Sequence, residues 1–284
     1  MIIWIASYPK SGNTWVRALL SYYFFSRNEK FDFNLLKHIP NFNIGDFVDN
    51  RIKFGSDIEY ADKALEVQNL ICQKYKVNSF FKTHSSLNKI DKEFFTDKSV
   101  SLGCIYVVRD PRNVITSYKN FENLNYDKAL KFMKDHKGFL LANKSTQQKL
   151  KIKGMELISS WSQNYNSWVN NKFHIPVCLI KYEDLIQDTL GQLKKMFEFV
   201  KKINLEKNTN FDILRAKRTI LETSFENLKK LENEKGFSEK NEKIRTQNFF
   251  NQGIMNDWKI NLPNNIKQDL EDNFRSEMVE LGYL

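Results

Sequence analysis

Cysteine is scarce in this chain of 284 residues, which contains only three. Cys72, Cys104 and Cys178 are far apart, and two of them lie in apolar stretches typical of strands. This pattern favours buried thiols in a reducing compartment over a disulfide framework or a metal site. No internal repeat and no linker rich in Pro, Gly and Ser divides the chain, so we expect a single domain over residues 1–284.

Long apolar runs are also missing. The apolar stretch at the N-terminus is too short for a signal peptide and lacks a basic segment before it. No other stretch approaches the length of a membrane span. We therefore expect a protein without a membrane span that works in the cytoplasm.

The charge is unbalanced, with 44 Lys and Arg against 34 Asp and Glu and a net charge of +10. Such a balance suits acidic partners: nucleic acid, an anionic membrane surface or a polyanionic small ligand. However, the basic residues are dispersed among Asn and Glu and form no dense block. A non-catalytic nucleic-acid-binding protein should carry clustered basic residues interleaved with aromatics. The dispersed charge makes this the least favoured class of function, and we expect no nucleic-acid partner.

Short β-branched and aromatic runs alternate with longer helical patterns. This alternation predicts an α/β fold with a central, mostly parallel sheet and helices on both faces. The expected strands cover residues 2–7, 78–82, 104–108 and 177–181. The expected helices cover residues 13–25, 57–76, 113–121, 126–135, 155–171, 189–202, 211–222 and 264–282. Residues 227–248 are charged and poor in large aliphatics, which suggests a mobile surface lid.

The first strand runs into a loop that reads Tyr-Pro-Lys-Ser-Gly-Asn-Thr-Trp over residues 8–15. A strand, a tight loop and a helix N-terminus together form an anion site, because the first N–H groups of a helix have no intrahelical partner. The Lys precedes the Gly, and the nucleoside-triphosphate motif G-x-x-x-x-G-K-[ST] is absent. A P-loop kinase or NTPase would share this strand, loop and helix, but it should also end a later strand in an Asp for Mg²⁺, and no such Asp is evident. This class is therefore kept as the alternative.

Further polar residues follow other expected strands, where ligands of open α/β sheets bind. Lys82 and His84 end the second strand, and a neutral His there is suited to act as a general base. Arg109 ends the third and offers a planar fork of donors, with Ser117 two helical turns beyond Pro111. Weaker signals are Tyr182, after the fourth strand, and a Gly-containing loop at residues 249–259.

Taken together and in this order, the motifs resemble those of the soluble sulfotransferases, which use 3′-phosphoadenosine 5′-phosphosulfate (PAPS). The resemblance spans nearly the whole chain. It implies the P-loop-NTPase-like fold of that family and transfer of a sulfuryl group to an acceptor hydroxyl or amine, leaving adenosine 3′,5′-bisphosphate (PAP). It also implies that no metal is required.

The resemblance assigns roles to these residues. The catalytic residues would be His84 as the base, Lys10, Lys82 and Ser117. The 5′-phosphosulfate would be held by Lys10, Ser11, Gly12, Asn13 and Thr14. The adenine would be held by Trp15, Tyr182, Thr223, Ser224 and Phe225. The 3′-phosphate would be held by Arg109, Ser117, Asn251, Gln252 and Gly253.

In this family the last of these loops usually reads Arg-Lys-Gly, whereas the chain has Asn251-Gln252-Gly253. Arg245 or Arg112 is the expected source of the missing charge. The acceptor is expected to be a small molecule or a glycan. Its pocket is expected to be built from residues 31–57, 126–154 and 227–248, whose Phe, Tyr and Leu residues favour an apolar molecule. The dimerisation motif of the family is not evident after Trp258, so the oligomeric state stays open.

Overall fold

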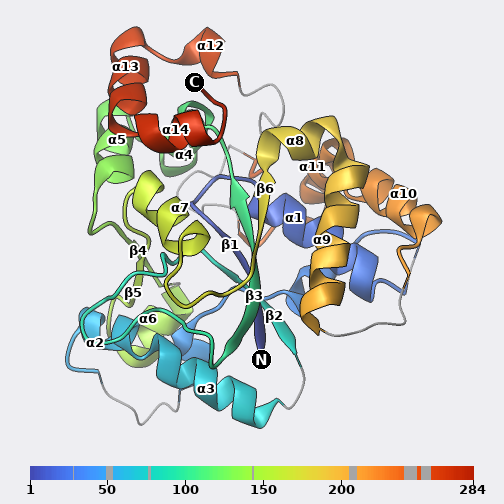
Figure 1. Ribbon diagram of the computed structural model, residues 1–284, viewed down its shortest axis with the longest axis horizontal. Coiled ribbons are helices and arrows are strands. Elements are labelled where there is room, and N and C mark those ends of the chain that lie inside the picture. The colour runs from blue at the N-terminus through green and yellow to red at the C-terminus, as the bar shows by residue number, and fades with distance from the viewer. Residues whose placement is uncertain are drawn as a thin grey trace.

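A four-stranded parallel sheet forms the centre of the computed structural model, in the strand order β2-β1-β3-β6 (Figure 1). The strands are β1 (Ile2–Ser7), β2 (Ser79–Thr83), β3 (Ser101–Val108) and β6 (Val177–Lys181). The structure describes residues 1–27, 29–48, 54–75, 78–142, 144–204, 210–239, 248–250 and 257–284. All four strands agree with the sequence prediction to within three residues at each end.

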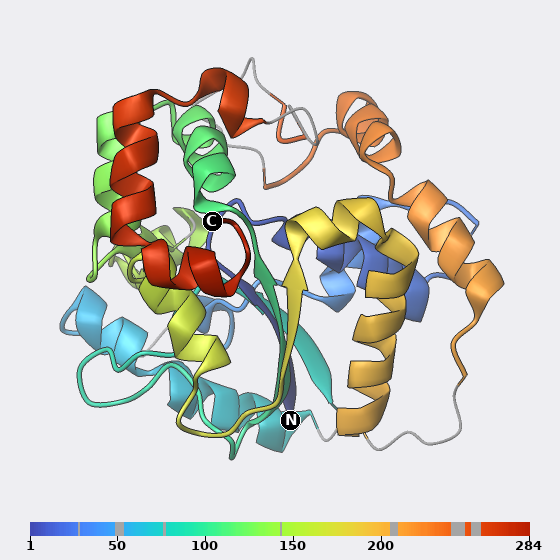
Figure 2. The same cartoon turned by 45° about the horizontal axis from the view of Figure 1, so that its top comes forward.

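Both faces of the sheet are covered, because alternate residues of the central strand enter two different cores (Figures 1 and 2). Trp4 and Ala6 of β1 face a core formed with α3 (Ala64–Lys74), α4 (Pro111–Glu122) and α7 (Trp161–Val169). Ile3 and Ile5 face a core formed with α1 (Asn13–Phe25) and α9 (Thr189–Asn204). Strands buried on both sides explain the nearly continuous apolar runs in the sequence.

The other elements surround this frame. The remaining α-helices are α2 (Asp57–Asp62), α5 (Tyr126–Lys134), α6 (Lys144–Leu150), α8 (Tyr182–Gln187), α10 (Ile213–Glu222), α11 (Phe225–Lys235), α12 (Trp258–Asn261), α13 (Asn264–Asn273) and α14 (Arg275–Glu280). The described residues also form two short 3₁₀ helices, η1 (Phe33–His38) and η2 (Ile44–Asp46). A small antiparallel pair consists of β4 (Phe139–Leu141) and β5 (Met155–Leu157).

The predicted helix over residues 155–171 is wrong in its first part. Residues 155–157 form β5, which pairs with β4, and the helix begins only after Ser160, whose side chain accepts from Gln163 N–H. A serine at the N-cap satisfies a free amide and sets the start of a helix. The predicted helix over residues 57–76 is in fact two helices, α2 and α3, and the one over residues 264–282 is likewise two, α13 and α14.

The predicted lid over residues 227–248 begins inside a regular helix. Its first nine residues belong to α11, which starts at the capping residue Ser224. Residues 240–247 lie outside the described residues. All three cysteines are free thiols; Cys104 and Cys178 are buried, as expected, whereas Cys72 is only half-buried. Within the described ranges, no helix is long and apolar enough to cross a membrane.

Candidate active site

The loop between β1 and α1 has the geometry of an anion cradle. Gly12 has φ +101°, and a Cβ at this position would lie 2.4 Å from Cδ2 of Tyr182. Only glycine therefore allows the Tyr182 ring to pack on the loop. Gly12 occupies the N-cap without a side-chain cap, so the first N–H groups of the 13-residue helix α1 point out of its N-terminus.

Two side chains of the loop behave differently. The Asn13 amide donates to the Ile5 carbonyl at 3.0 Å and to Ser7 Oγ at 3.1 Å, so it ties the loop to β1. By contrast, Ser11 Oγ is fully buried and has no partner. A buried hydroxyl without a partner is unfavourable, and a ligand oxygen would satisfy it. Of these two side chains, Ser11 thus fits an anion contact, whereas the Asn13 side chain is occupied within the protein.

Lys10 lies in the same loop and has φ +66°, the left-handed region. Its Nζ sits 3.9 Å from the ring centroid of Phe121 and 4.4 Å from that of Phe249. Burial, together with the positive charges of Arg109 and Lys82, lowers the pKa of Lys10 from 10.5 to about 7. A cation destabilised in this way gains most from a bound anion.

His84 follows β2 and faces the end of β1. Its Nδ1 lies 2.8 Å from the Ser7 carbonyl oxygen. A carbonyl oxygen can only accept, so Nδ1 carries the proton and Nε2 carries the lone pair. Burial, followed by the charge of Lys82, holds the pKa of His84 well below its usual 6.5. The imidazole is therefore neutral at pH 7, the form that a general base requires.

Glu156 fixes the backbone that carries His84. One carboxylate oxygen accepts from His84 N–H at 2.8 Å, from Thr83 Oγ1 at 2.8 Å and from Ser85 Oγ at 3.0 Å. On the other side, Asn164 Nδ2 donates to the His84 carbonyl at 2.9 Å. Sequence reasoning missed Glu156, because it assigned residues 155–157 to a helix, and no motif marks a residue 72 positions away from its partner.

Arg109 lies at the end of β3, on the far side of the loop. Its Nη1 donates to the Lys10 carbonyl at 3.3 Å, and its guanidinium lies 4.3 Å from the ring centroid of Tyr182. Its Nε is buried without a partner. Ser117 lies half-buried on α4, the helix that follows Arg109. The structure therefore holds an arginine with an unsatisfied donor near the cradle, as an oxyanion site needs.

Aromatic rings meet beside the start of α1. The planes of Trp15 and Tyr182 form an edge contact at 71°, with centroids 5.9 Å apart. Trp15 Nε1 donates to the Thr223 carbonyl at 2.9 Å, which joins α1 to the end of α10. The Thr223 hydroxyl donates within its own helix to Thr219, and Ser224 caps α11. Phe225 is half-buried against Phe250.

Arg112, one of the two arginines expected to supply the missing charge at the 3′-phosphate, is engaged elsewhere. Arg112 binds Asp110 and Glu271, each at 2.7 Å, and donates to the Tyr283 carbonyl at 2.8 Å. It is thus committed to holding the C-terminal helices and is not available in place of the family's Arg-Lys pair. Arg245, Asn251, Gln252 and Gly253 lie outside the described residues.

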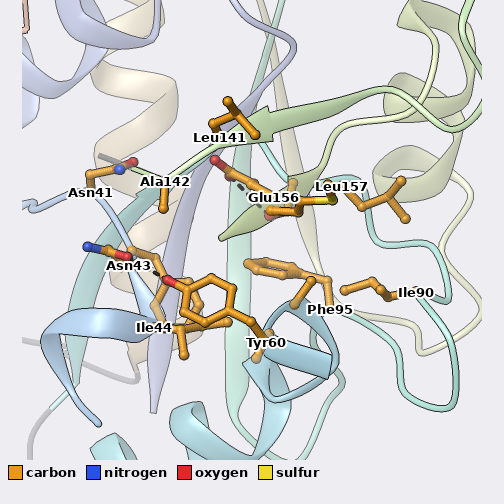
Figure 3. Close-up of a pocket in the computed structure, with 15 residues that line it drawn as sticks. Asn41, Asn43, Ile44, Tyr60, Ile90, Phe95, Leu141, Ala142, Glu156 and Leu157 are labelled. Atoms are coloured by element: carbon orange, nitrogen blue, oxygen red, sulfur yellow. Dashed lines mark hydrogen bonds between the residues drawn. The ribbon is translucent and has the colours of Figure 1, made fainter. Parts of the chain in front are cut away.

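A small cavity lies beside Glu156, whose carboxylate accepts from the His84 N–H (Figure 3). Its volume is about 70 Å³, and Ser85 and Glu156 form part of its wall. Tyr60 and Asn43 also line it and are joined by a hydrogen bond of 2.8 Å. Apolar contacts come from Phe42, Ile44, Ile90, Phe95, Leu141 and Leu157. In the part of the chain that the structure describes, no group of three or more His, Cys, Asp and Glu could hold a metal ion.

A sequence model described as the sulfotransferase domain matches residues 2–282. Human Sulfotransferase 2A1 is 23% identical over 280 residues, which cover 98% of this chain and 84% of that protein. The amine sulfotransferase of Oryctolagus cuniculus is 23% identical over 285 residues, covering 97% and 80%. The dog protein Sulfotransferase 1B1 is 25% identical over 260 residues, covering 90% and 76%.

Solved structures share the fold. Mouse sulfotransferase SULT7A1, complexed with PAP, superposes with a TM-score of 0.57 at 17% identity, covering 97% of this chain and 83% of that one. Retinol dehydratase, in complex with androsterone and inactive cofactor PAP, gives a TM-score of 0.56 at 14% identity, covering 98% and 80%. At this level of identity the likeness supports the architecture described above.

Proposed function

The chain belongs to the sulfotransferase family and is a sulfotransferase, and from this premise we propose that it takes a sulfuryl group from PAPS with His84 as the base. The acceptor would be a hydroxyl or an amine. The single observation that carries the proposal is the hydrogen bond from His84 Nδ1 to the Ser7 carbonyl. It leaves Nε2 unprotonated in a group whose pKa lies well below 6.5.

The donor fits the described residues on three counts. The N-terminus of α1 offers free N–H groups, and both Ser11 Oγ and Arg109 Nε are buried polar atoms without partners. Arg109 and Ser117 would hold the 3′-phosphate, and Trp15 and Tyr182 would flank the adenine. The names of two structural neighbours, which are complexes with PAP, support the same nucleotide. When bound, PAPS supplies the activated sulfuryl group.

In this proposal the residues of the chain position and stabilise charge. His84 Nε2 accepts the proton of the acceptor group. Lys10 would stabilise charge on the oxygen that leaves with the phosphate, and Lys82 would stabilise charge on the sulfuryl oxygens. Burial lowers the pKa of both lysines, so each is stabilised as negative charge develops nearby. Ser117 would draw Lys10 toward the 3′-phosphate until an acceptor is present.

We propose that the acceptor binds through the cavity beside Glu156. At about 70 Å³ the cavity would take only part of an acceptor, and its apolar wall, with the hydroxyl of Tyr60 and the carboxylate of Glu156, suits a partly apolar end that carries a hydroxyl or an amine (Figure 3). The amine sulfotransferase among the relatives supports the amine as one option. Labelled PAPS, offered with phenols, aliphatic alcohols, amines and glycans in turn, identifies the acceptor class.

The test of His84 uses the variants His84→Ala and His84→Asn. An Asn amide keeps an N–H for the Ser7 carbonyl but offers no basic nitrogen. Turnover should therefore fall by at least about 100-fold in both variants, as expected for loss of a general base. PAP binding, measured by calorimetry, should change less than about threefold, because His84 is not part of the nucleotide site.

The exposed His136 provides the control. His136→Ala should match the wild type in both measurements. A His84→Asn protein with wild-type turnover would refute the assignment of the base. Thermal stabilisation by PAP but not by ATP with Mg²⁺ separates the proposal from a P-loop kinase.

We also propose that the protein acts in the cytoplasm, which is supported by the zebrafish relative named cytosolic sulfotransferase 1.

A further inference from the structure

A second arginine lies on α1, the helix that begins at the anion cradle. Arg17 lies on α1 three residues after Thr14 and is only 3% exposed. Its Nε donates to the Ile39 carbonyl at 3.0 Å, which fixes the plane of the guanidinium. Its Nη1 forms an ion pair of 2.5 Å with Glu239. A buried arginine held in this way is positioned to bind an oxyanion.

The Glu239 carboxylate lies among the groups assigned to the donor site. Its second oxygen accepts from Thr14 Oγ1 at 3.4 Å. Burial alone would raise the pKa of Glu239, but the charges of Lys82 and Arg17 outweigh burial and lower it from 4.5 to about 2. Glu239 is therefore ionised at neutral pH, and it occupies Arg17 and Thr14, two groups beside the loop expected to bind phosphosulfate.

Described contacts hold this carboxylate in place. Phe237, two residues earlier, is buried with its ring centroid 4.6 Å from that of Phe33 and 4.9 Å from that of Phe249. Lys235 at the end of α11 pairs with Asp32 at 2.7 Å. These contacts anchor the segment that leads to Glu239.

We propose that Arg17, with Thr14 and Lys82, forms an oxyanion subsite for the 5′-phosphosulfate end of the donor, and that Glu239 is a built-in competitor for this subsite. The proposal rests on the function proposed above and adds to it a binding residue, Arg17, and a residue that opposes binding. A carboxylate and a phosphate or sulfate present similar oxygen pairs to a guanidinium. The donor must therefore displace Glu239 from Arg17. The affinity of the protein for the donor is reduced by the free energy of the Arg17–Glu239 ion pair.

The first test compares Glu239→Gln with Glu234→Gln. The two residues are five positions apart in the sequence. Glu234 is exposed on α11 and lies 3.9 Å from Lys230, a weaker ion pair than that of Glu239 with Arg17. Affinity for PAP, measured by calorimetry, should rise about tenfold in Glu239→Gln, the effect of about 1.4 kcal/mol. It should stay within about twofold of the wild type in Glu234→Gln. Unchanged or weaker binding in Glu239→Gln overturns the proposal, because a purely structural partner of Arg17 would give that result.

The second test adds Arg17→Gln to form a double-mutant cycle. Arg17→Gln should weaken PAP binding by about tenfold, and in its background the gain from Glu239→Gln should fall below about twofold. Independent, additive effects would overturn the role of Arg17. If Arg17→Gln does not fold, the single variant Glu239→Gln still decides the competition.

Inorganic sulfate serves as a second probe that does not depend on the nucleotide. It should raise the melting temperature of Glu239→Gln at lower concentrations than it does for the wild type. If the wild type binds no PAP, the proposed donor is wrong, while the sulfate comparison still tests the subsite. If PAP binds but neither probe distinguishes Glu239→Gln, only the competition is wrong.

Discussion

Replacing Gly12 by alanine tests the geometry of the cradle most directly. The backbone at Gly12 has φ +101°, and the added methyl group would lie 2.4 Å from Cδ2 and 2.8 Å from Cε2 of Tyr182. Gly282 also has a positive φ, of +69°, but nothing lies within 4 Å of a Cβ built there. The pair therefore separates backbone strain from the clash with the ring.

The magnitudes follow from these two contributions. A left-handed conformation costs an alanine about 1–2 kcal/mol, and both variants carry that penalty. Overpacking a filled site costs about 1–3 kcal/mol more, and only Gly12→Ala carries it. Gly12→Ala should thus be destabilised by about 2–5 kcal/mol and Gly282→Ala by about 1–2 kcal/mol. The free energy of unfolding, measured in urea for both variants, gives the difference.

The same variant should also disturb the nucleotide site. Tyr182 supports the guanidinium of Arg109 at 4.3 Å, so a displaced ring moves this arginine. PAP affinity should fall in Gly12→Ala and stay at the wild-type value in Gly282→Ala. In the double variant Gly12→Ala with Tyr182→Ala, the ring is gone. The loss of unfolding free energy caused by Gly12→Ala should then shrink to the contribution of the left-handed backbone conformation. Equal destabilisation of the two single glycine variants would refute the reasoning.

Two other predictions concern charge. Because the pKa of Lys10 is lowered to about 7, and a bound anion favours its protonated form, PAP affinity should be highest below pH 7. It should decrease by up to about tenfold per pH unit above 7, a trend that calorimetry between pH 6 and pH 9 would detect and that Lys10→Met should abolish. Arg112→Gln leaves Asp110 and Glu271 without their buried partner, so the free energy of unfolding in urea should fall by about 3–5 kcal/mol. The exposed control Arg275→Gln should cost less than about 0.5 kcal/mol, and a similarly small loss in Arg112→Gln would contradict the role of this network.

The main elements of the site could be predicted from the sequence because their signals are local. The apolar run of β1, the glycine and the start of α1 lie within 24 residues of one another, and each has its own pattern. Parallel strands bring their carboxyl ends to one edge of a sheet, so His84 and Arg109 could be expected near Lys10. The hydrogen bond from Arg109 Nη1 to the Lys10 carbonyl, at 3.3 Å, shows that these two residues are close.

Other features could not be predicted because they depend on partners far along the chain. Residues 155–157 have a helical pattern locally, yet they form a strand whose Glu156 binds the backbone N–H of His84. The proton on His84 Nδ1 depends on the Ser7 carbonyl, 77 residues away. Neither partner leaves a periodic signal in the sequence.

The sequence by itself thus determined the four strands of the central sheet, the loop between β1 and α1 and the set of residue types at the strand ends. Only the tertiary structure decided which nitrogen of His84 is basic, how far the pKa of Lys10 is lowered and which carboxylate faces Arg17. These properties arise from burial and from charges in contact, and Glu239 lies 222 residues after Arg17. Local pattern specifies the elements, whereas the electrostatics of the site exists only once distant segments pack together.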